Sequence, residues 1–244
     1  MKDYGVVTVK KIWTKRRVVS TLLLIFICLF GVIALLTYYG QHVGSFTISM
    51  SDKASKHSIY LSTDPSFASY QPRLMCDSLE NAKNVPYMAI KKDYVKKTNG
   101  TYLSNDKSYI GYTFYLMNMS EESISLKADL EIAQATKGVE DAAWIWFFQG
   151  ENDLNGTIYQ KEDNISDKEY QERYGQYEYP STTAFKSDDV VFSRVINNVE
   201  PNEVIKFTLI LWLEGQDPDC NDQIVGGSIN FNLNIILYSE SDEA

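Results

Sequence analysis

The residues with the clearest chemical potential lie in LWLEGQDPDCND, Leu211 to Asp222, where an alternating apolar run ends in a group of acidic side chains. Asp217, Asp219 and Asn221 recur at every second residue, as hard oxygen ligands of Ca²⁺ do in binding loops. The EF-hand pattern fails, because its sixth position is not Gly and its twelfth is not Glu. The stretch makes Asp217, Asp219 and Asp222 candidate calcium ligands, and the alternative is an exposed strand end that a turn closes.

Other chemistry finds less support in the residues. Glu214 with Asp217 or Asp219 is the natural carboxylate pair for glycoside hydrolysis, but acidic pairs are too abundant here to indicate an active site. The two histidines, His42 and His57, form no HExxH motif, and the chain has neither a G-x-S-x-G nucleophile turn nor a phosphate-binding glycine loop. We therefore predict no catalytic residue, and no cofactor apart from the weak calcium candidate.

The three cysteines differ in their surroundings. Cys28 lies inside a long apolar run, where it packs as a small apolar residue. Cys76 and Cys220 lie outside that run, and they form one possible disulfide if their compartment is oxidising.

Strands must position most of these residues. Period-two alternation of apolar side chains predicts strands in the ranges 44–51, 57–65, 109–119, 123–132, 190–199, 204–215 and 227–238. The run 142–148 is apolar on both faces and predicts a central strand. In the strand before the acidic group, Leu211 and Leu213 face the core, whereas Trp212 and Glu214 face the other way. Many short strands without a βαβ rhythm predict an all-β fold, an antiparallel β-sandwich over residues 40–244.

Two further segments interrupt the strands. Residues 86–100 predict a helix, because Tyr87, Ile90 and Tyr94 recur at helical spacing. The remaining face is lysine-rich, and we interpret it as a solvated surface. Residues 149–188 are polar, acidic and tyrosine-rich, and they predict a long insertion between strands or a partner-binding loop.

A membrane helix is predicted before the sandwich. The run from Val18 to Tyr39 carries no charge, and as a helix it would be about 33 Å long, enough to cross a bilayer core. The run is too long for a cleaved signal peptide, and basic residues crowd the tail 1–17 that precedes it. The positive-inside rule then predicts a single-pass protein of the plasma membrane, with a cytoplasmic N-terminus and an extracellular C-terminal domain.

Charge argues against nucleic acid as a partner. The first 40 residues hold six of the 23 basic residues and one of the 32 acids, so the outer part is more acidic than the net charge of −9 suggests. Such a surface repels phosphate backbones.

The segments KFTLILWLEGQDPDCNDQIVGGSINFNL, YIGYTFYLMNMSEESISLKADLEI and GSFTIS carry a distant resemblance. They are similar to exported surface proteins of Gram-positive bacteria, the TasA and camelysin group, whose members carry a SipW-type signal. The resemblance implies a jelly-roll-like sandwich at the cell surface, in a family linked with biofilm matrix fibres and a claimed peptidase activity. This chain departs from the group in its predicted uncleaved anchor and in lacking zinc-peptidase ligands.

We therefore expect a membrane-anchored extracellular β-sandwich with a structural or binding role toward an extracellular protein or wall partner. A matrix or fibre subunit released from the membrane is one alternative, and a surface hydrolase is another.

Overall fold

The computed structural model describes residues 19–30, 42–80, 82–162 and 180–239. The chain divides into two compact units, residues 1–40 and residues 41–244. In the first unit, residues 19–30 form a helix with exposed side chains. Within the described ranges, no helix combines the length and the apolar character needed to cross a membrane. Val18, residues 31–39 and the tail 1–17 lie outside the described residues, so the predicted span is described only in part.

The second unit consists mainly of strands. Its elements are β1 (His42–Val43), β2 (Ser45–Met50), α2 (Asp52–Lys56), β3 (Ile59–Ser62), β4 (Arg73–Met75), β5 (Leu79–Glu80), η1 (Tyr87–Ala89), α3 (Lys92–Lys97), β6 (Gly100–Leu103), β7 (Tyr109–Asn118), β8 (Ile124–Ala135), α4 (Val139–Ala142), β9 (Ala143–Gln149), β10 (Thr157–Gln160), β11 (Thr182–Ala184), β12 (Val190–Val199), β13 (Val204–Leu213), η2 (Asp222–Ile224) and β14 (Ile229–Tyr238). They confirm the predicted β-rich fold.

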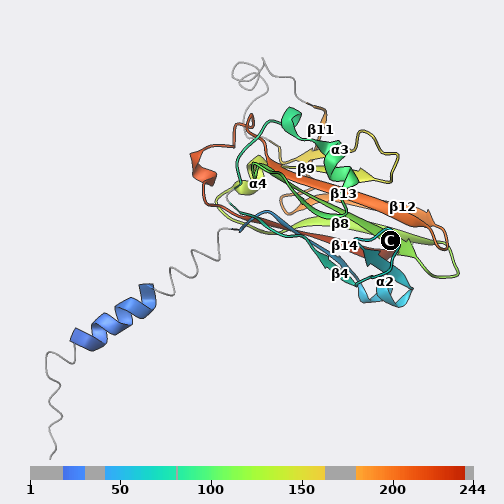
Figure 1. Cartoon of the computed structure of the whole chain (residues 1–244), viewed down its shortest axis with the longest axis horizontal. Helices are drawn as coiled ribbons and strands as arrows, with labels where there is room; N and C mark the ends of the chain where they lie inside the picture. The colour runs from blue at the N-terminus through green and yellow to red at the C-terminus, as the bar shows by residue number, and fades with distance from the viewer. Residues whose placement is uncertain (1–18, 31–41, 81, 163–179, 240–244) are drawn as a thin grey trace, which may run out of the picture. The chain divides into compact units, whose positions relative to one another are not determined.

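The strands form two large sheets that pack as a sandwich (Figure 1). The seven-stranded sheet has the order β11-β10-β9-β13-β7-β3, with β6 also paired to β7, and the five-stranded sheet has the order β12-β8-β14-β2-β4. The main core lies between them, where Phe147 of β9 meets Phe192 of β12 with ring centroids 4.7 Å apart. Arg194 of β12 lies over the Phe147 ring and donates from Nε to the Tyr159 hydroxyl, at 2.8 Å.

The sheets are mixed, which corrects the prediction of a purely antiparallel sandwich. Strand β14 pairs in parallel with β2, and β10 pairs in parallel with β11. The β2–β14 pair is reinforced by side chains, because Ser45 donates to the Asn230 amide oxygen at 2.8 Å and Ser49 does the same to Asn234. A period-two pattern indicates which side chains share a face, but it does not indicate the direction of the neighbouring strand.

The large sheet is buried on both faces, because a second apolar cluster covers its outer side. That cluster contains Ile90, Val95, Tyr109, Trp144, Trp146, Phe148, Ile158, Ile210 and Trp212. Strand β9 supplies three of these rings and lies between β10 and β13, as its two-sided apolar sequence predicted. The cover is the segment with η1 and α3, which lies over the sheet (Figure 1).

The predicted helix at 86–100 is therefore two short pieces rather than one. Val95 of α3 is fully buried over Gly111 of β7, where a glycine is required, because a β-carbon there would overlap Val95 Cγ1. Lys92 and Lys96 donate to the backbone oxygens of Leu154 and Asp153 and lie over aromatic rings of β9. Lys92 and Lys96 thus bind the η1–α3 segment to the sheet, so this part of the lysine-rich face is not simply solvated.

The predicted insertion at 149–188 also contains sheet structure. Strand β10 pairs with β9 in a hairpin, and β11 extends the same sheet by pairing with β10. Residues 163–179 lie outside the described residues.

Candidate functional site

Two tryptophans fix the end of strand β13. Trp212 of β13 and Trp144 of β9 are direct neighbours in the sheet, with ring centroids 6.0 Å apart, and both are buried in the outer cluster. A buried indole N–H requires a hydrogen-bond acceptor. The acceptors come from the acidic stretch that follows β13, so the strand end and the acids form one unit.

Glu214 supplies the first acceptor. Its Oε2 accepts from Trp212 Nε1 at 2.9 Å and from the Tyr87 backbone N–H at 2.8 Å, and its Oε1 accepts from the Gln216 backbone N–H at 3.1 Å. The residue is 0% exposed. Burial raises the pKa of Glu214 above its ordinary value, and the three N–H donors oppose that shift without outweighing it.

Asp217 supplies the second acceptor. Its Oδ2 accepts from Trp144 Nε1 at 2.7 Å and its Oδ1 from the Asp219 backbone N–H at 2.8 Å, and the residue is 4% exposed. The expected exposed acidic corner is therefore wrong for Glu214 and Asp217. They are buried because they satisfy indole and backbone donors that apolar residues could not satisfy.

The corner is held against the segment that leads into η1. Val85 donates its backbone N–H to the Leu213 carbonyl at 3.0 Å, and the Gly215 N–H returns to the Val85 carbonyl at 3.2 Å. Asn84 Nδ2 donates to Cys220 Sγ at 3.4 Å. Residues 82–85 and the acidic stretch thus form the two sides of a depression.

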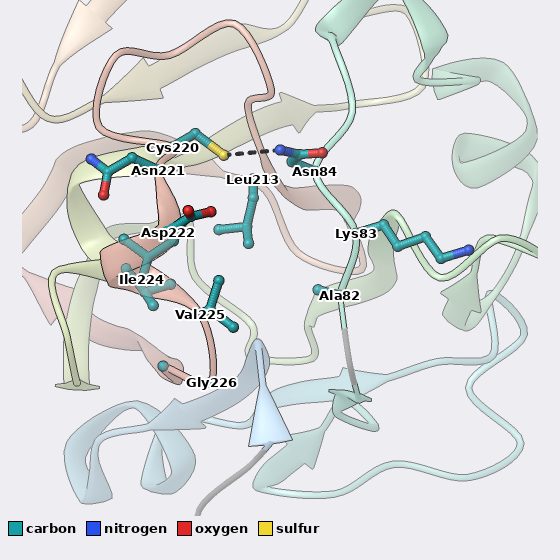
Figure 2. A pocket seen from close by; sticks show the side chains of 12 residues that line it. Ala82, Lys83, Asn84, Leu213, Cys220, Asn221, Asp222, Ile224, Val225 and Gly226 are labelled. Carbon is teal, nitrogen blue, oxygen red and sulfur yellow. Dashed lines mark hydrogen bonds between the residues drawn. The ribbon is translucent and has the colours of Figure 1, made fainter.

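This depression is a cavity of about 650 Å³, shown in Figure 2. Its apolar lining residues are Ala82, Val139, Leu213, Ile224 and Val225, and its polar ones are Lys83, Asn84, Cys220, Asn221 and Asp222. In Figure 2 the Cys220 sulfur points toward Asn84, and the Leu213 and Val225 side chains point into the space between the two walls. The volume and the mixture of apolar walls with a few polar groups are typical of small-ligand pockets.

The pocket favours binding over nucleophilic chemistry. Burial raises the pKa of the Cys220 thiol, and the carboxylates of Asp217 and Glu214 raise that pKa further. Little thiolate, the reactive form of cysteine, then exists at neutral pH. His57 is exposed at the end of α2, where its Nδ1 contacts the Lys53 carbonyl oxygen at 2.8 Å, and it is not among the residues lining the pocket.

The structure separates the three calcium candidates. Asp217 faces the Trp144 indole, whereas Asp222 is exposed at the start of η2 and lines the pocket. Burial raises the pKa of Asp219, and the neighbouring Asp141 carboxylate raises it further. In the part of the chain that the structure describes, no three or more His, Cys, Asp or Glu side chains group as metal ligands. Calcium binding by these residues stays a prediction.

Nor do the other sequence candidates meet in one site. Cys76 and Cys220 are free thiols, so the predicted disulfide is not formed in the structure. Cys76 is buried after β4, where its backbone N–H binds the Phe46 carbonyl, while Cys220 lies at the pocket beside Asn84. Of the glycosidase candidates, Glu214 and Asp217 are buried at 0% and 4% exposure, and Asp219 is half-buried.

Sequence reasoning missed the pairing of indoles with carboxylates, although one signal for it was present. A tryptophan on an apolar strand needs an acceptor, and the acid nearest to Trp212 in the sequence is its partner Glu214. For Trp144 the nearest acid in the sequence is Asp141 rather than its partner Asp217, so no local signal indicated that bond.

The fold and pocket define a mixed β-sandwich with a small cavity at one sheet end. The sequence matches no known family model and no curated protein. Among solved structures, a β-glucosidase from Kluyveromyces marxianus in complex with glucose is similar at 12% identity, with a TM-score of 0.28, over 76% of this chain and 17% of that one. The adhesin domain of Epf from Streptococcus pyogenes is similar at 11% identity, with a TM-score of 0.23, over 73% of this chain and 57% of that one. The chain thus spans less than a fifth of that glucosidase and just over half of that adhesin domain.

Proposed function

We propose that the protein is a membrane-anchored binding module, in which the helix containing residues 19–30 holds the β-sandwich at the outer cell surface. The observation that carries this proposal is the exposure of that helix. Its large apolar side chains, Val19, Leu22, Leu23, Leu24, Ile25, Phe26, Ile27, Leu29 and Phe30, are each between 56% and 68% exposed. An apolar surface of this extent is unfavourable in water and favourable in a lipid bilayer.

The sequence around this helix supports a spanning orientation. The uncharged run extends from Val18 to Tyr39, and Lys10, Lys11, Lys15, Arg16 and Arg17 precede it. Basic residues are retained on the cytoplasmic side, so the sandwich, which begins within a few residues of the run, faces outward. The acidic sandwich with its pocket then serves as the module that meets an extracellular protein or wall partner.

The TasA and camelysin kinship and a jelly-roll-like winding of the sandwich belong to the same proposal. They are supported by the quoted sequence segments and by the pairing of the N-terminal strand β2 with the C-terminal strand β14. A released fibre subunit differs from an anchored module in one measurable respect, which is the location of the mature chain.

The test is fractionation of cells that express the full chain. We expect the full-length protein in the membrane pellet after washes with high salt and with alkaline carbonate, and a variant lacking residues 1–40 in the soluble fraction. Leu24→Arg with Ile27→Arg should weaken retention, because two charges in an apolar span oppose insertion. Leu154→Arg is the matched control, since Leu154 is an exposed apolar residue of the sandwich. A chain that carbonate extracts, or that accumulates in the culture supernatant in a shortened form, contradicts the anchor.

A further inference from the structure

A second groove lies on the outer side of the large sheet, apart from the Cys220 pocket. Its volume is about 480 Å³, and it is lined by Lys96 and Lys97 of α3, Lys206 of β13, Tyr115 of β7, Asn99, Asp93 and Glu151. Three lysines therefore line one groove of an otherwise acidic domain. The surrounding cover is also basic, since residues 83–107 contain six lysines but only Asp93 and Asp106 as acids.

Lys206 is the central cation of this groove. Its side chain is only 12% exposed, and its ammonium lies over the Tyr115 ring, 5.9 Å from the ring centroid. Among the described residues its ion-pair partner is Glu151, with Nζ and Oε1 3.0 Å apart, and the Glu151 side chain is 77% exposed. A nearly buried ammonium thus depends on a carboxylate that is largely in water. An ion pair with one exposed partner contributes little, so a better anion can displace the carboxylate.

The remaining walls suit an oxyanion. Lys97 is exposed beside Lys206, and Lys96 lies along the Phe148 ring with its ammonium 5.0 Å from the centroid. The Tyr115 hydroxyl donates to Asn99 Oδ1 at 2.8 Å, which leaves the Asn99 amide nitrogen as a further donor in the groove. Lysine ammonium groups bind phosphate as point charges, and several around one anion give the strongest attraction.

We propose that this groove is a binding site for a phosphate ester group, in which Lys206 and Lys97 hold the phosphate and Glu151 is its internal competitor. When the ester binds, the Glu151 carboxylate leaves Lys206 and moves into solvent. The site contains no residue of the membrane helix or of the Cys220 pocket, so binding of a soluble ester stands independently of the proposed anchoring, whereas binding of a lipid headgroup rests on it.

Glu151 makes the proposal sharply testable, because its removal should strengthen binding. The full chain is placed in dodecyl maltoside micelles, which contain no phosphate, and titrated with glycerol phosphate, and protection of Lys97 from acylation is followed by mass spectrometry. We expect Glu151→Gln to lower the half-saturating concentration about two- to five-fold, as expected for the loss of an exposed ion pair. Lys206→Met, which keeps the buried stem, should raise it about tenfold or more. Glu121→Gln is the matched control, because Glu121 is an exposed acid in the turn between β7 and β8.

A second arm identifies the source of the phosphate. In this arm the protein is placed in phosphatidylglycerol nanodiscs and no ester is added. If Lys97 is protected there, and Lys206→Met abolishes the protection, the site binds a lipid headgroup. Protection by glycerol phosphate, with the opposite effects of Glu151→Gln and Lys206→Met, would assign it to a soluble ester. No protection in either arm, or protection that both substitutions leave unchanged, overturns the proposal. Circular dichroism checks that Lys206→Met is folded, and Glu151→Gln keeps the test valid if it is not.

Discussion

At the scale of residues, Glu214 and Asp217 act as buried hydrogen-bond acceptors. Each carboxylate binds one indole N–H of the Trp144–Trp212 pair and at least one backbone N–H. Burying a charge costs free energy unless hydrogen bonds compensate it, and here three N–H groups bind Glu214 and two bind Asp217. The acids therefore fix where β13 ends and where the pocket wall begins.

Asp217→Ala should destabilise the protein more than alanine substitution of an exposed acid in the same loop does. The substitution leaves the buried Trp144 N–H without its acceptor, which costs about 1–3 kcal/mol in the free energy of unfolding. Urea denaturation followed by tryptophan fluorescence measures the change. Asp222→Ala is the matched control, because Asp222 is exposed in the same loop. Equal effects of the two substitutions would mean that the indole bond contributes nothing.

Glu214 should give the protein a distinctive pH dependence. Because burial raises the pKa of Glu214 in the folded protein, the folded state holds this proton more tightly than the unfolded chain does. The resulting stability is fully present below the ordinary pKa of 4.5 and is lost as the pH rises through the folded pKa. The unfolding free energy of wild type minus that of Glu214→Gln should therefore decrease from pH 4 toward pH 8. Denaturation curves across this range measure it, and a difference that grows with pH would contradict the raised pKa.

The sequence predicted the faces of β13 but not the burial of the acids that follow. Leu211 lies in the main core and Trp212 in the outer cluster, as alternation indicated. The environment of Glu214 and Asp217 depends on Trp144, which is far away in the sequence, and on the cover that contains Tyr87. Acids at strand ends are usually solvated, so local pattern alone favoured the wrong environment.

At the scale of elements, alternation was sufficient to predict the long strands but insufficient to predict which strands pair with one another. Strands β8 and β14 show the predicted buried and solvated faces along most of their length. The parallel partner of β14 is β2, which lies near the start of the domain's sequence, and no local pattern specifies such a pairing. The helix predicted at 86–100 is divided into η1 and α3, and it contacts the sheet through separate side chains, of which Val95 is fully buried.

The fit of α3 on the large sheet can be tested at Gly111. Gly111→Ala places a β-carbon against Val95 Cγ1, so α3 must shift away from β7 at a cost of about 1–3 kcal/mol. We expect lower unfolding free energy and faster amide exchange in residues 92–97. Adding Val95→Ala should recover part of the loss, because it removes the overlapping methyl groups. If the double variant is as unstable as the sum of the single ones, the two residues do not share this contact.

At the scale of the whole molecule, the chain combines an apolar helix with basic residues before it and an acidic sandwich after it. The proposed orientation, with the tail 1–17 inside and the sandwich outside, follows from this distribution of charge. Cysteines report the orientation directly, because the sandwich holds one partly exposed thiol, Cys220, and one buried thiol, Cys76. Burial raises the pKa of Cys76 to about 12, which keeps it unreactive.

In intact cells, a membrane-impermeant maleimide should therefore label Cys220. The reaction is run on a Cys28→Ser background at about pH 8.5, since burial also raises the pKa of Cys220 and slows labelling at neutral pH. Adding Cys220→Ser should abolish the signal, which assigns it to the pocket thiol. A thiol placed in the tail by Thr8→Cys, on the background without Cys28 and Cys220, should react only after the cells are lysed. Labelling of the tail in intact cells, with Cys220 protected until lysis, would reverse the orientation and place the pocket on the cytoplasmic side.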